Sequence, residues 1–207
     1  MKTIVYIDGQ NFLYKVAEIL KDHNVISGKQ ELNAINIRAV FERLFPKIDL
    51  EIRFFGVAKI RHRPDFGPEI LEKSKIFSDN LRKIRNNLVK QNIDYVEVGN
   101  LKIRDSDICK TCGSKDYRYQ EKGVDVGLAV SLVEDALMDV VDNIILASSD
   151  TDMVPAVLCA EKAGKKVTYV GFDGKMTRAL INKSNSSKAI KDKDVIEAYI
   201  GGMNKNA

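Results

Sequence analysis

Residues 3–20 of this chain read TIVYIDGQNFLYKVAEIL, and this stretch decides the fold. Its first residues, Thr3–Ile7, are short, apolar and largely β-branched, which predicts a buried strand. From Asn11 to Leu20 the apolar residues recur at helical spacing, which predicts a helix directly after the strand. Asp8 falls at the junction between the two. A strand that passes at once into a helix is typical of α/β domains.

The rest of the chain continues this alternation. Strands are predicted at 50–58, 93–98, 143–147 and 166–170, and helices at 35–45, 68–91, 124–140 and 153–163. The candidate buried stripe of the long helix consists of Ile70, Leu71, Phe77, Leu81, Ile84 and Leu88. The pattern predicts one three-layer α/β domain at residues 1–200, with a mainly parallel sheet of five or six strands. A cysteine-containing loop insertion is expected at about 99–120, and a frayed tail at 201–207.

Composition places the chain among globular proteins. Its 207 residues, 44% hydrophobic and 30% charged, are enough for one well-buried domain. The N-terminus does not resemble a secretory signal, because Asp8, Asn11 and Lys15 interrupt the apolar run early. No apolar segment is long enough to cross a bilayer, and three cysteines, an odd number, favour a reducing compartment. We therefore expect a cytoplasmic protein without a membrane partner.

Charge is distributed unevenly along the sequence. Between Glu121 and Glu161 there are nine acidic residues and a single base, whereas the segments 53–104 and 162–207 each carry six more bases than acids. A fold that brings these segments together would place an acidic cleft within basic surroundings, which suits a metal site that meets a polyanion. The alternative is that surface helices simply alternate in sign.

Four aspartates stand at the ends of predicted strands or at the starts of predicted helices, namely Asp8, Asp125, Asp150 and Asp152. In open parallel sheets the functional crevice lies beyond the carboxyl ends of the strands. If the strand order is 3-2-1-4-5, Asp8 and Asp150 face the same crevice although 142 positions separate them. Because carboxylate oxygens suit hard divalent cations, the four aspartates are candidate catalytic residues and ligands for Mg²⁺ or Mn²⁺. Asn11 is a further catalytic candidate.

Each of these residues also has a plain structural interpretation. An aspartate or asparagine at the start of a helix is commonly a cap, and that role suits Asp150 or Asn11 equally. Asp125 and Asp135 lie ten residues apart, roughly 15 Å along a helix, so one ion cannot bind both. Asp125 is preferred as the ligand, which leaves Asp135, with Glu134 and Asp139, as a solvated face.

Further candidates concern the substrate and a second metal. A basic cluster formed by Lys59, Arg61 and Arg63 can contact a nucleic-acid backbone, or it is a solvated loop. Lys122 and Ser149 are the other substrate-binding candidates. Cys109 and Cys112 have the spacing of a zinc knuckle, but a structural zinc site needs four ligands and the second pair is missing. A reduced, vestigial pair is therefore preferred over zinc.

Three stretches together resemble the NYN-domain family, the LabA-like branch of the PIN-like nucleases. They are YIDGQN at 6–11, EKGVDVGLAVSLVEDAL at 121–137 and ILASSDTDMVPAVLCAEKAGKKVTYVGF at 145–172. The resemblance implies a Rossmann-like PIN-type fold and a metal-dependent ribonuclease site, with the family's acidic residues on Asp8, Asp125, Asp150 and Asp152 and its amide on Asn11. Many relatives carry a further aspartate where this chain has Ser131, whereas others resemble it in having one at Asp135. PIN-like folds also often form homodimers.

The leading interpretation is a metal-dependent ribonuclease that cuts single-stranded RNA endonucleolytically. A related nuclease acting on single-stranded DNA belongs to the same interpretation. Bound Mg²⁺ or Mn²⁺ would activate water, so no protein nucleophile is needed. A hydrolase triad is disfavoured because the two histidines, His23 and His62, lie near no promising serine or cysteine. The chain also lacks GxxxxGK[ST] and GxGxxG loops for nucleotides.

Two alternatives remain open. A phosphomonoesterase could use Asp8 as a covalent nucleophile, although such enzymes commonly need a second aspartate at the position that Gln10 occupies. A non-catalytic RNA-binding or regulatory module is the other alternative, and Ser131 is the feature that favours it.

Overall fold

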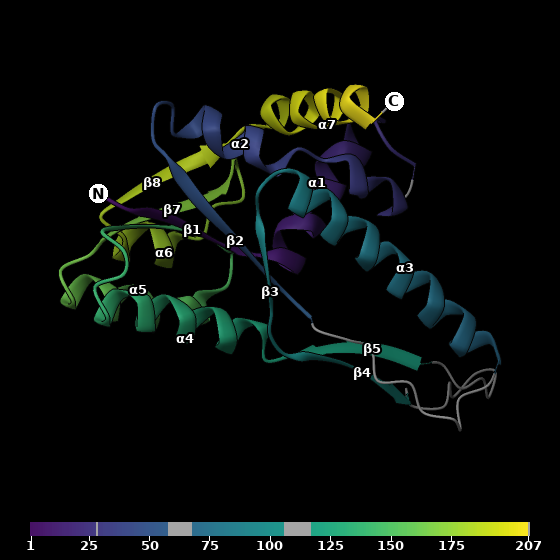
Figure 1. Ribbon diagram of the computed structural model, residues 1–207, viewed down its shortest axis with the longest axis horizontal. Helices are drawn as coiled ribbons and strands as arrows, with labels where there is room; N and C mark the ends of the chain where they lie inside the picture. Colours follow the sequence, from purple (N-terminus) through teal and green to yellow (C-terminus); the bar gives the residue numbers. More distant parts are fainter. Residues whose placement is uncertain (28, 58–67, 106–116, 207) are drawn as a thin grey trace.

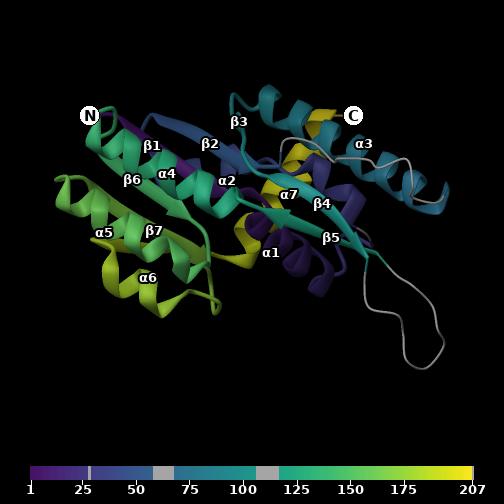
Figure 2. The same ribbon diagram turned by 90° about the horizontal axis from the view of Figure 1, so that it is seen from below.

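A twisted parallel sheet with helices on both faces forms the centre of the molecule (Figure 1, Figure 2). The computed structural model describes residues 1–27, 29–57, 68–105 and 117–206. The strands lie in the order β3-β2-β1-β6-β7-β8. Their bounds are β1 Thr3–Asp8, β2 Leu50–Gly56, β3 Asp94–Glu97, β6 Asn143–Ala147, β7 Lys166–Phe172 and β8 Ser186–Ile190. The predicted α/β class and the predicted order of the first five strands are confirmed, and β8 extends the sheet at one edge.

Two helical layers cover the sheet. One face is covered by α1 Gly9–Asp22, α2 Ile37–Leu44 and α7 Asp192–Asn206, and the other by α4 Val124–Leu137, α5 Val154–Lys162 and α6 Arg178–Lys183. The long α3 Pro68–Lys90 runs beside the β3 edge, and two short 3₁₀ helices occupy Lys29–Ala34 and Thr151–Met153. Within the described ranges, no helix has the length and apolarity needed to span a membrane.

The central strand β1 is buried on both faces because its side chains alternate between the two layers. Val5 and Ile7 pack into the layer of α1 and α2, whereas Ile4 and Tyr6 pack into the layer of α4 and α5. Such a strand reads as a continuous apolar run, as residues 3–7 do. The parallel register sets Ile7 beside Ala147, so β1 and β6 end at the same edge of the sheet.

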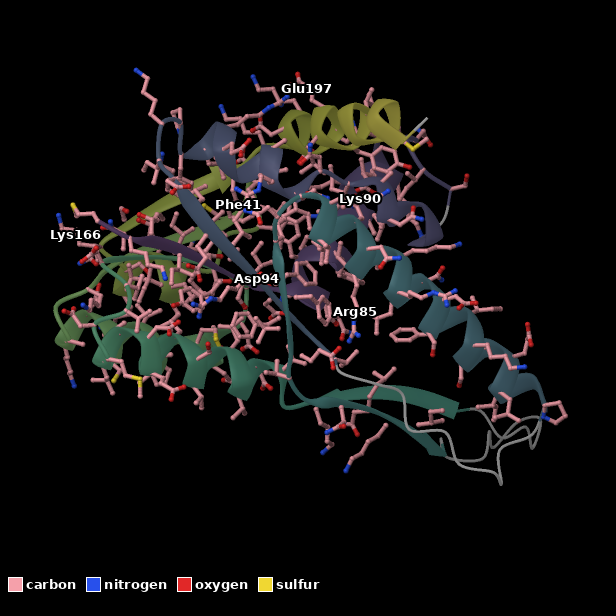
Figure 3. All side chains as sticks on the ribbon, in the orientation of Figure 1. Phe41, Arg85, Lys90, Asp94, Lys166 and Glu197 are labelled. Carbon is pink, nitrogen blue, oxygen red and sulfur yellow. The ribbon has the colours of Figure 1, made fainter. Side chains whose placement is uncertain are left out.

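Side chains fill the space on both sides of the sheet (Figure 3). Phe41 of α2 is fully buried and stacks on Phe12 of α1, with ring centroids 5.9 Å apart. Arg85 of α3 reaches the β3 edge, where its Nη1 lies 2.5 Å from a carboxylate oxygen of Glu97. Its guanidinium also lies 4.3 Å from the ring centroid of Tyr95, so that α3 is held to the edge by charge and by ring contact.

The outer half of α3 departs from the predicted buried stripe. Ile70 and Leu88 are buried, but Phe77 is 36% exposed and Ser74 is fully buried. In this half α3 extends beyond the sheet, toward a hairpin of β4 Asn100–Asp105 and β5 Tyr117–Lys122, and Ile70 packs in one cluster with Leu101 and Ile103 of that hairpin (Figure 1). Both strands of that hairpin fall largely within the loop insertion expected at about 99–120, and the residues between the strands lie outside the described ranges. At the C-terminus, α7 continues to Asn206, where a frayed tail was predicted.

Candidate active site

An open hollow of about 620 Å³ lies at the carboxyl end of β1. Its lining consists of Asp8, Gln10, Asn11, Tyr14, Lys15, Gln120, Lys122, Gly123, Asp125, Val126 and Asp150. The strand order reverses between β1 and β6, which is where ligands bind in open α/β sheets. The fold thus brings together four of the five catalytic candidates and one substrate-binding candidate, from segments far apart in the sequence.

Asp8 lies at the floor of the hollow as the N-cap of α1. One carboxylate oxygen accepts from the Asn11 backbone N–H at 3.2 Å, and the other accepts from the Ser148 hydroxyl at 3.2 Å. Burial raises the pKa of the Asp8 carboxyl above its ordinary value, and the neighbouring carboxylates of Asp150 and Asp125 raise it further, against these two hydrogen bonds. The site therefore concentrates negative charge that a proton or a cation would relieve.

Ser148 connects the ends of β1 and β6. It is 5% exposed, and its hydroxyl donates to Asp8 while accepting from the Asp150 backbone N–H at 3.1 Å. Asp150 in turn caps the 3₁₀ turn at Thr151–Met153 by accepting from the Asp152 backbone N–H at 2.9 Å. Asp8 and Asp150 thus cap helical turns and line the hollow at once, so a capping role does not exclude a role in a site.

Asn11 and Ser149 hold each other at the adjoining wall. The Asn11 amide nitrogen lies 2.8 Å from the Ser149 hydroxyl, which also lies 3.0 Å from the amide oxygen. The Thr177 hydroxyl donates to the Ser149 carbonyl oxygen at 2.9 Å, which fixes the chain after β6. Asn11 is therefore oriented by a side chain 138 positions away.

Asp125 reaches the hollow from the opposite wall. Gly123 has a φ of +84°, a left-handed conformation that lets β5 turn directly into α4. Asp125 consequently falls in the first turn of α4, and Lys122, exposed at the end of β5, stands beside it on the lining. The sequence EKGVD thus places the Lys122 ammonium and the Asp125 carboxylate together on the lining of the hollow.

Asp152 does not join the other three aspartates on this lining. It is exposed and lines a separate apolar hollow between α4 and α5, beside Ala129 and Pro155. Two residues along a 3₁₀ turn rotate a side chain by about 240°, which separates Asp152 from Asp150. The basic candidates Lys59, Arg61 and Arg63 and the cysteines Cys109 and Cys112 lie outside the described residues, so their roles stay predictions.

The donor atoms suit a hard divalent ion. Asp8, Asp125 and Asp150 offer carboxylate oxygens and Ser148 and Ser149 offer hydroxyls, without a sulfur or imidazole ligand among them. Among the described residues, no group of three Asp, Glu, His or Cys side chains is gathered closely enough to hold an ion by itself. Mg²⁺ commonly binds through one or two carboxylates, with waters and substrate phosphate completing its shell, so this set fits.

Asp135 lies away from the hollow, and its predicted place on a solvated face is wrong. Its side chain is 15% exposed and one oxygen lies 2.6 Å from both the Tyr6 hydroxyl and Arg53 Nη1. Burial and this carboxylate raise the pKa of Tyr6. Glu134 and Asp139 are exposed as expected. Asp135 therefore does not supply, in this structure, the acidic group that many relatives carry at the position of Ser131.

Asp135→Asn is expected to lower the free energy of unfolding by about 1–3 kcal/mol and to leave nucleic-acid cleavage unchanged, because a charged hydrogen-bond acceptor is lost outside the hollow. Urea unfolding and an activity assay on the same preparation check this. Glu134→Gln, at an exposed neighbour, is the matched control and should change stability by less than about 0.5 kcal/mol. Loss of cleavage activity in a folded Asp135→Asn variant would contradict the placement of Asp135 outside the site.

Several lining residues were not predicted as site residues. Gln10, Tyr14 and Lys15 share the face of α1 that Asn11 occupies, opposite the buried Phe12 and Val16. For Tyr14 and Lys15, the spacing of three and four residues from Asn11 was the available signal, since positions on one helix face recur at that interval. Ser148 and Gln120 gave no such signal, because only the tertiary fold shows what they touch.

Comparison with known proteins gives a family and a fold. A family model described as the NYN domain matches residues 2–191. Among solved structures, the chain is similar to a protein of unknown function from Vibrio parahaemolyticus, with 20% identity and a TM-score of 0.50 over 91% of this chain and 92% of that chain. At this identity the likeness concerns the fold alone. No curated protein gives a significant match to the chain.

Proposed function

We propose that this chain, which belongs to the NYN-domain family of PIN-like nucleases, is a metal-dependent ribonuclease that cuts single-stranded RNA at internal phosphodiester bonds. The observation that carries the proposal is the meeting of Asp8, Asp125 and Asp150 in one open hollow, where their mutual repulsion helps to raise the pKa of Asp8. Uncompensated carboxylates at a topological switch point are a reason to expect a functional cation.

Each residue has a role in this proposal. Asp8, Asp125 and Asp150, together with waters and the substrate phosphate, would hold Mg²⁺ or Mn²⁺. When bound, such an ion lowers the pKa of water and neutralises charge on a phosphate. Asn11, fixed by Ser149, can donate its amide N–H to a phosphate oxygen or to an attacking water. Lys122 on one wall and Lys15 on the other present positive charge to the RNA backbone. Asp152 lines another surface, and we propose that it would influence the bound ion only through intervening water.

The shape of the hollow supports cleavage within a strand. It is open to solvent and is bounded by α1 on one side and by the end of β5 on the other. A strand lying between these walls can continue past the carboxylates in both directions, so a free end is not required. The cytoplasmic location and a homodimer remain predictions.

The proposal is tested by incubating labelled single-stranded RNA, single-stranded DNA and a phosphomonoester with the protein, in Mn²⁺ or in EDTA. Internal RNA cleavage that EDTA abolishes is the expected result. Phosphate release from the monoester alone would establish the phosphatase instead, and RNA binding without turnover in any divalent ion would establish a non-catalytic module. DNA cleavage at a comparable rate would widen the substrate class beyond RNA.

Asp150→Asn and Asp152→Asn form a matched pair two residues apart. Asp150→Asn is expected to lower kcat/KM for RNA about 100-fold, because it removes a carboxylate from the hollow. Asp152→Asn should lower it less than about tenfold, since this side chain lines another surface. Asparagine can cap the turn in place of Asp150, so both variants should keep the wild-type melting temperature within a few degrees. Equal losses would contradict the assignment of Asp152 to a secondary role.

A further inference from the structure

Tyr14 is the aromatic side chain on the lining of the candidate site. It lies on α1 one turn beyond Gln10 and three residues beyond Asn11, and it is 56% exposed. Asp8 and Tyr14 are six positions apart, which corresponds to about 9 Å along the helix axis. A large aromatic ring this exposed, beside a group of carboxylates, has no part in the core that the other side of α1 builds with Phe12 and Val16.

The charges around Tyr14 suit a nucleotide. The Lys15 ammonium lies 5.7 Å from the centroid of the Tyr14 ring. It also lies 3.4 Å from one carboxylate oxygen of Glu18. The other oxygen of Glu18 lies 2.9 Å from the Lys175 ammonium, so two ammonium groups are held on this side of α1 by one carboxylate. A base stacked on the ring would therefore have its phosphate close to positive charge, while its neighbour toward Asp8 meets the carboxylates.

We propose that Tyr14 is a stacking platform for an unpaired base next to the cleaved phosphate, and that it makes the site select single-stranded substrate. This inference rests on the proposed nuclease function. A base inside a duplex has both faces covered by its neighbours, whereas an unpaired base can leave the stack and lie on an aromatic ring. Stacking tolerates any base, so the platform gives preference for strandedness rather than for sequence.

The residues at the two ends of this face of α1 have different roles. Asp8 and Asn11 act on the phosphate that is cut, and Tyr14 positions the adjoining nucleotide. Tyr14 is accordingly a positioning residue, and its loss should weaken substrate binding much more than the turnover of bound substrate. Gln120 and Lys122 line the opposite wall of the same hollow.

The test compares Tyr14→Ala, Tyr14→Phe and wild type on a short unstructured RNA and on versions with a single abasic position moved along the strand. Dissociation constants are measured in EDTA by fluorescence anisotropy, and KM and kcat in Mn²⁺. For wild type, one abasic position should raise the dissociation constant about 5- to 150-fold. Tyr14→Ala should show the same loss with intact RNA and no further loss at that abasic position, with kcat within about threefold of wild type.

Tyr14→Phe should bind and cut as wild type does, because stacking needs the ring and not the hydroxyl. Val89→Ala, an exposed apolar residue of α3 away from the hollow, controls for general surface effects and should change nothing. Two results would overturn the inference: unchanged affinity in Tyr14→Ala, or a loss in Tyr14→Phe as large as in Tyr14→Ala.

These outcomes are separable from failure of the proposed function. If wild type binds RNA and discriminates abasic RNA through Tyr14 in EDTA but cuts nothing in Mn²⁺, the platform stands and the nuclease proposal falls. If wild type cuts RNA with equal KM for intact and abasic strands, the nuclease proposal stands and the platform falls.

Discussion

Asp8→Asn is expected to reduce metal-dependent RNA cleavage by at least about 10³-fold, the largest loss of activity for any single change in this chain. Asp8 lies at the floor of the hollow, and its carboxylate is close enough to Asp150 and Asp125 for their charges to raise its pKa. Asparagine has nearly the same shape but carries no charge, so the electrostatic attraction for a divalent ion falls most at this position. Initial rates over a range of Mn²⁺ concentrations measure the loss.

The same variant should be more stable than wild type at neutral pH. Because the pKa of Asp8 is raised in the folded protein, ionisation above that pKa disfavours folding, and the unfolded chain holds fewer protons than the native one. Asparagine removes this penalty and can still accept the Asn11 N–H as a cap. The melting temperature should rise about 2–4 °C for each kcal/mol relieved.

The pH dependence of that gain is the control. The difference in stability between variant and wild type should be full above the native pKa of Asp8 and should disappear as the pH falls below the ordinary pKa of an aspartate, about 4, where the carboxyl becomes protonated in both states. A variant that is destabilised at pH 7 would mean that Asp8 is chiefly a structural cap. Retained cleavage in the folded variant would remove Asp8 from the site.

Gly9→Ala is expected to destabilise the fold by about 1–3 kcal/mol or more, a large effect for the addition of one methyl group. Gly9 begins α1 directly after Asp8, and a Cβ there would lie 2.5 Å from the Phe55 carbonyl oxygen and would overlap the Phe54 ring. The clash with backbone cannot be relieved by a rotamer change, so α1 must move away from β2. Because Asp8 and Asn11 move with it, activity should fall together with stability.

Gly201→Ala in α7 is the matched control, since nothing lies within 4 Å of a Cβ at that position. Alanine in an exposed helix should be neutral or should stabilise by about 0.5–1 kcal/mol. Thermal unfolding of both variants measures the contrast. If Gly9→Ala melts with wild type, α1 approaches β2 less closely than the structure indicates.

The sequence predicts best the strands that are buried on both faces of the sheet. The runs at 4–7 and 144–147 are apolar throughout, because β1 and β6 are central strands, and β6 has the predicted bounds Asn143–Ala147. β8 was missed because an edge strand needs no such run: SSKAI at 186–190 is polar and largely exposed, and reads as a loop.

The C-terminal helix was missed for a different reason. Gly201 and Gly202 read as the end of a helix, yet α7 continues past them to Asn206. Gly202 lies where α7 crosses the 3₁₀ turn at Lys29–Ala34, and a Cβ there would overlap the Ala34 carbonyl oxygen. The glycine is thus used for a close approach between segments far apart in the chain, which local patterns do not reveal.

The candidate site was predictable in proportion to how directly each residue follows a strand. Asp8 ends β1 and Asp150 follows the end of β6 by three residues, so topology alone places them at one edge. Asp152 follows Asp150 by two residues, but the 3₁₀ turn carries it to another surface. Asp135 looked solvated because neither Tyr6 nor Arg53, its partners across the layer, is near it in the sequence.

The strand made first in this chain is a central one, and its two neighbours in the sheet are synthesised long after it. β1 pairs with β2 at Leu50–Gly56 and with β6 at Asn143–Ala147, so the nascent N-terminus must wait for most of the chain to leave the ribosome before its pocket can close. Ser148 and Asp150 emerge in the same late segment. The hollow is therefore completed by segments that lie far along the chain from β1, and its carboxylates come together only once the pairing of β1 with β6 has formed.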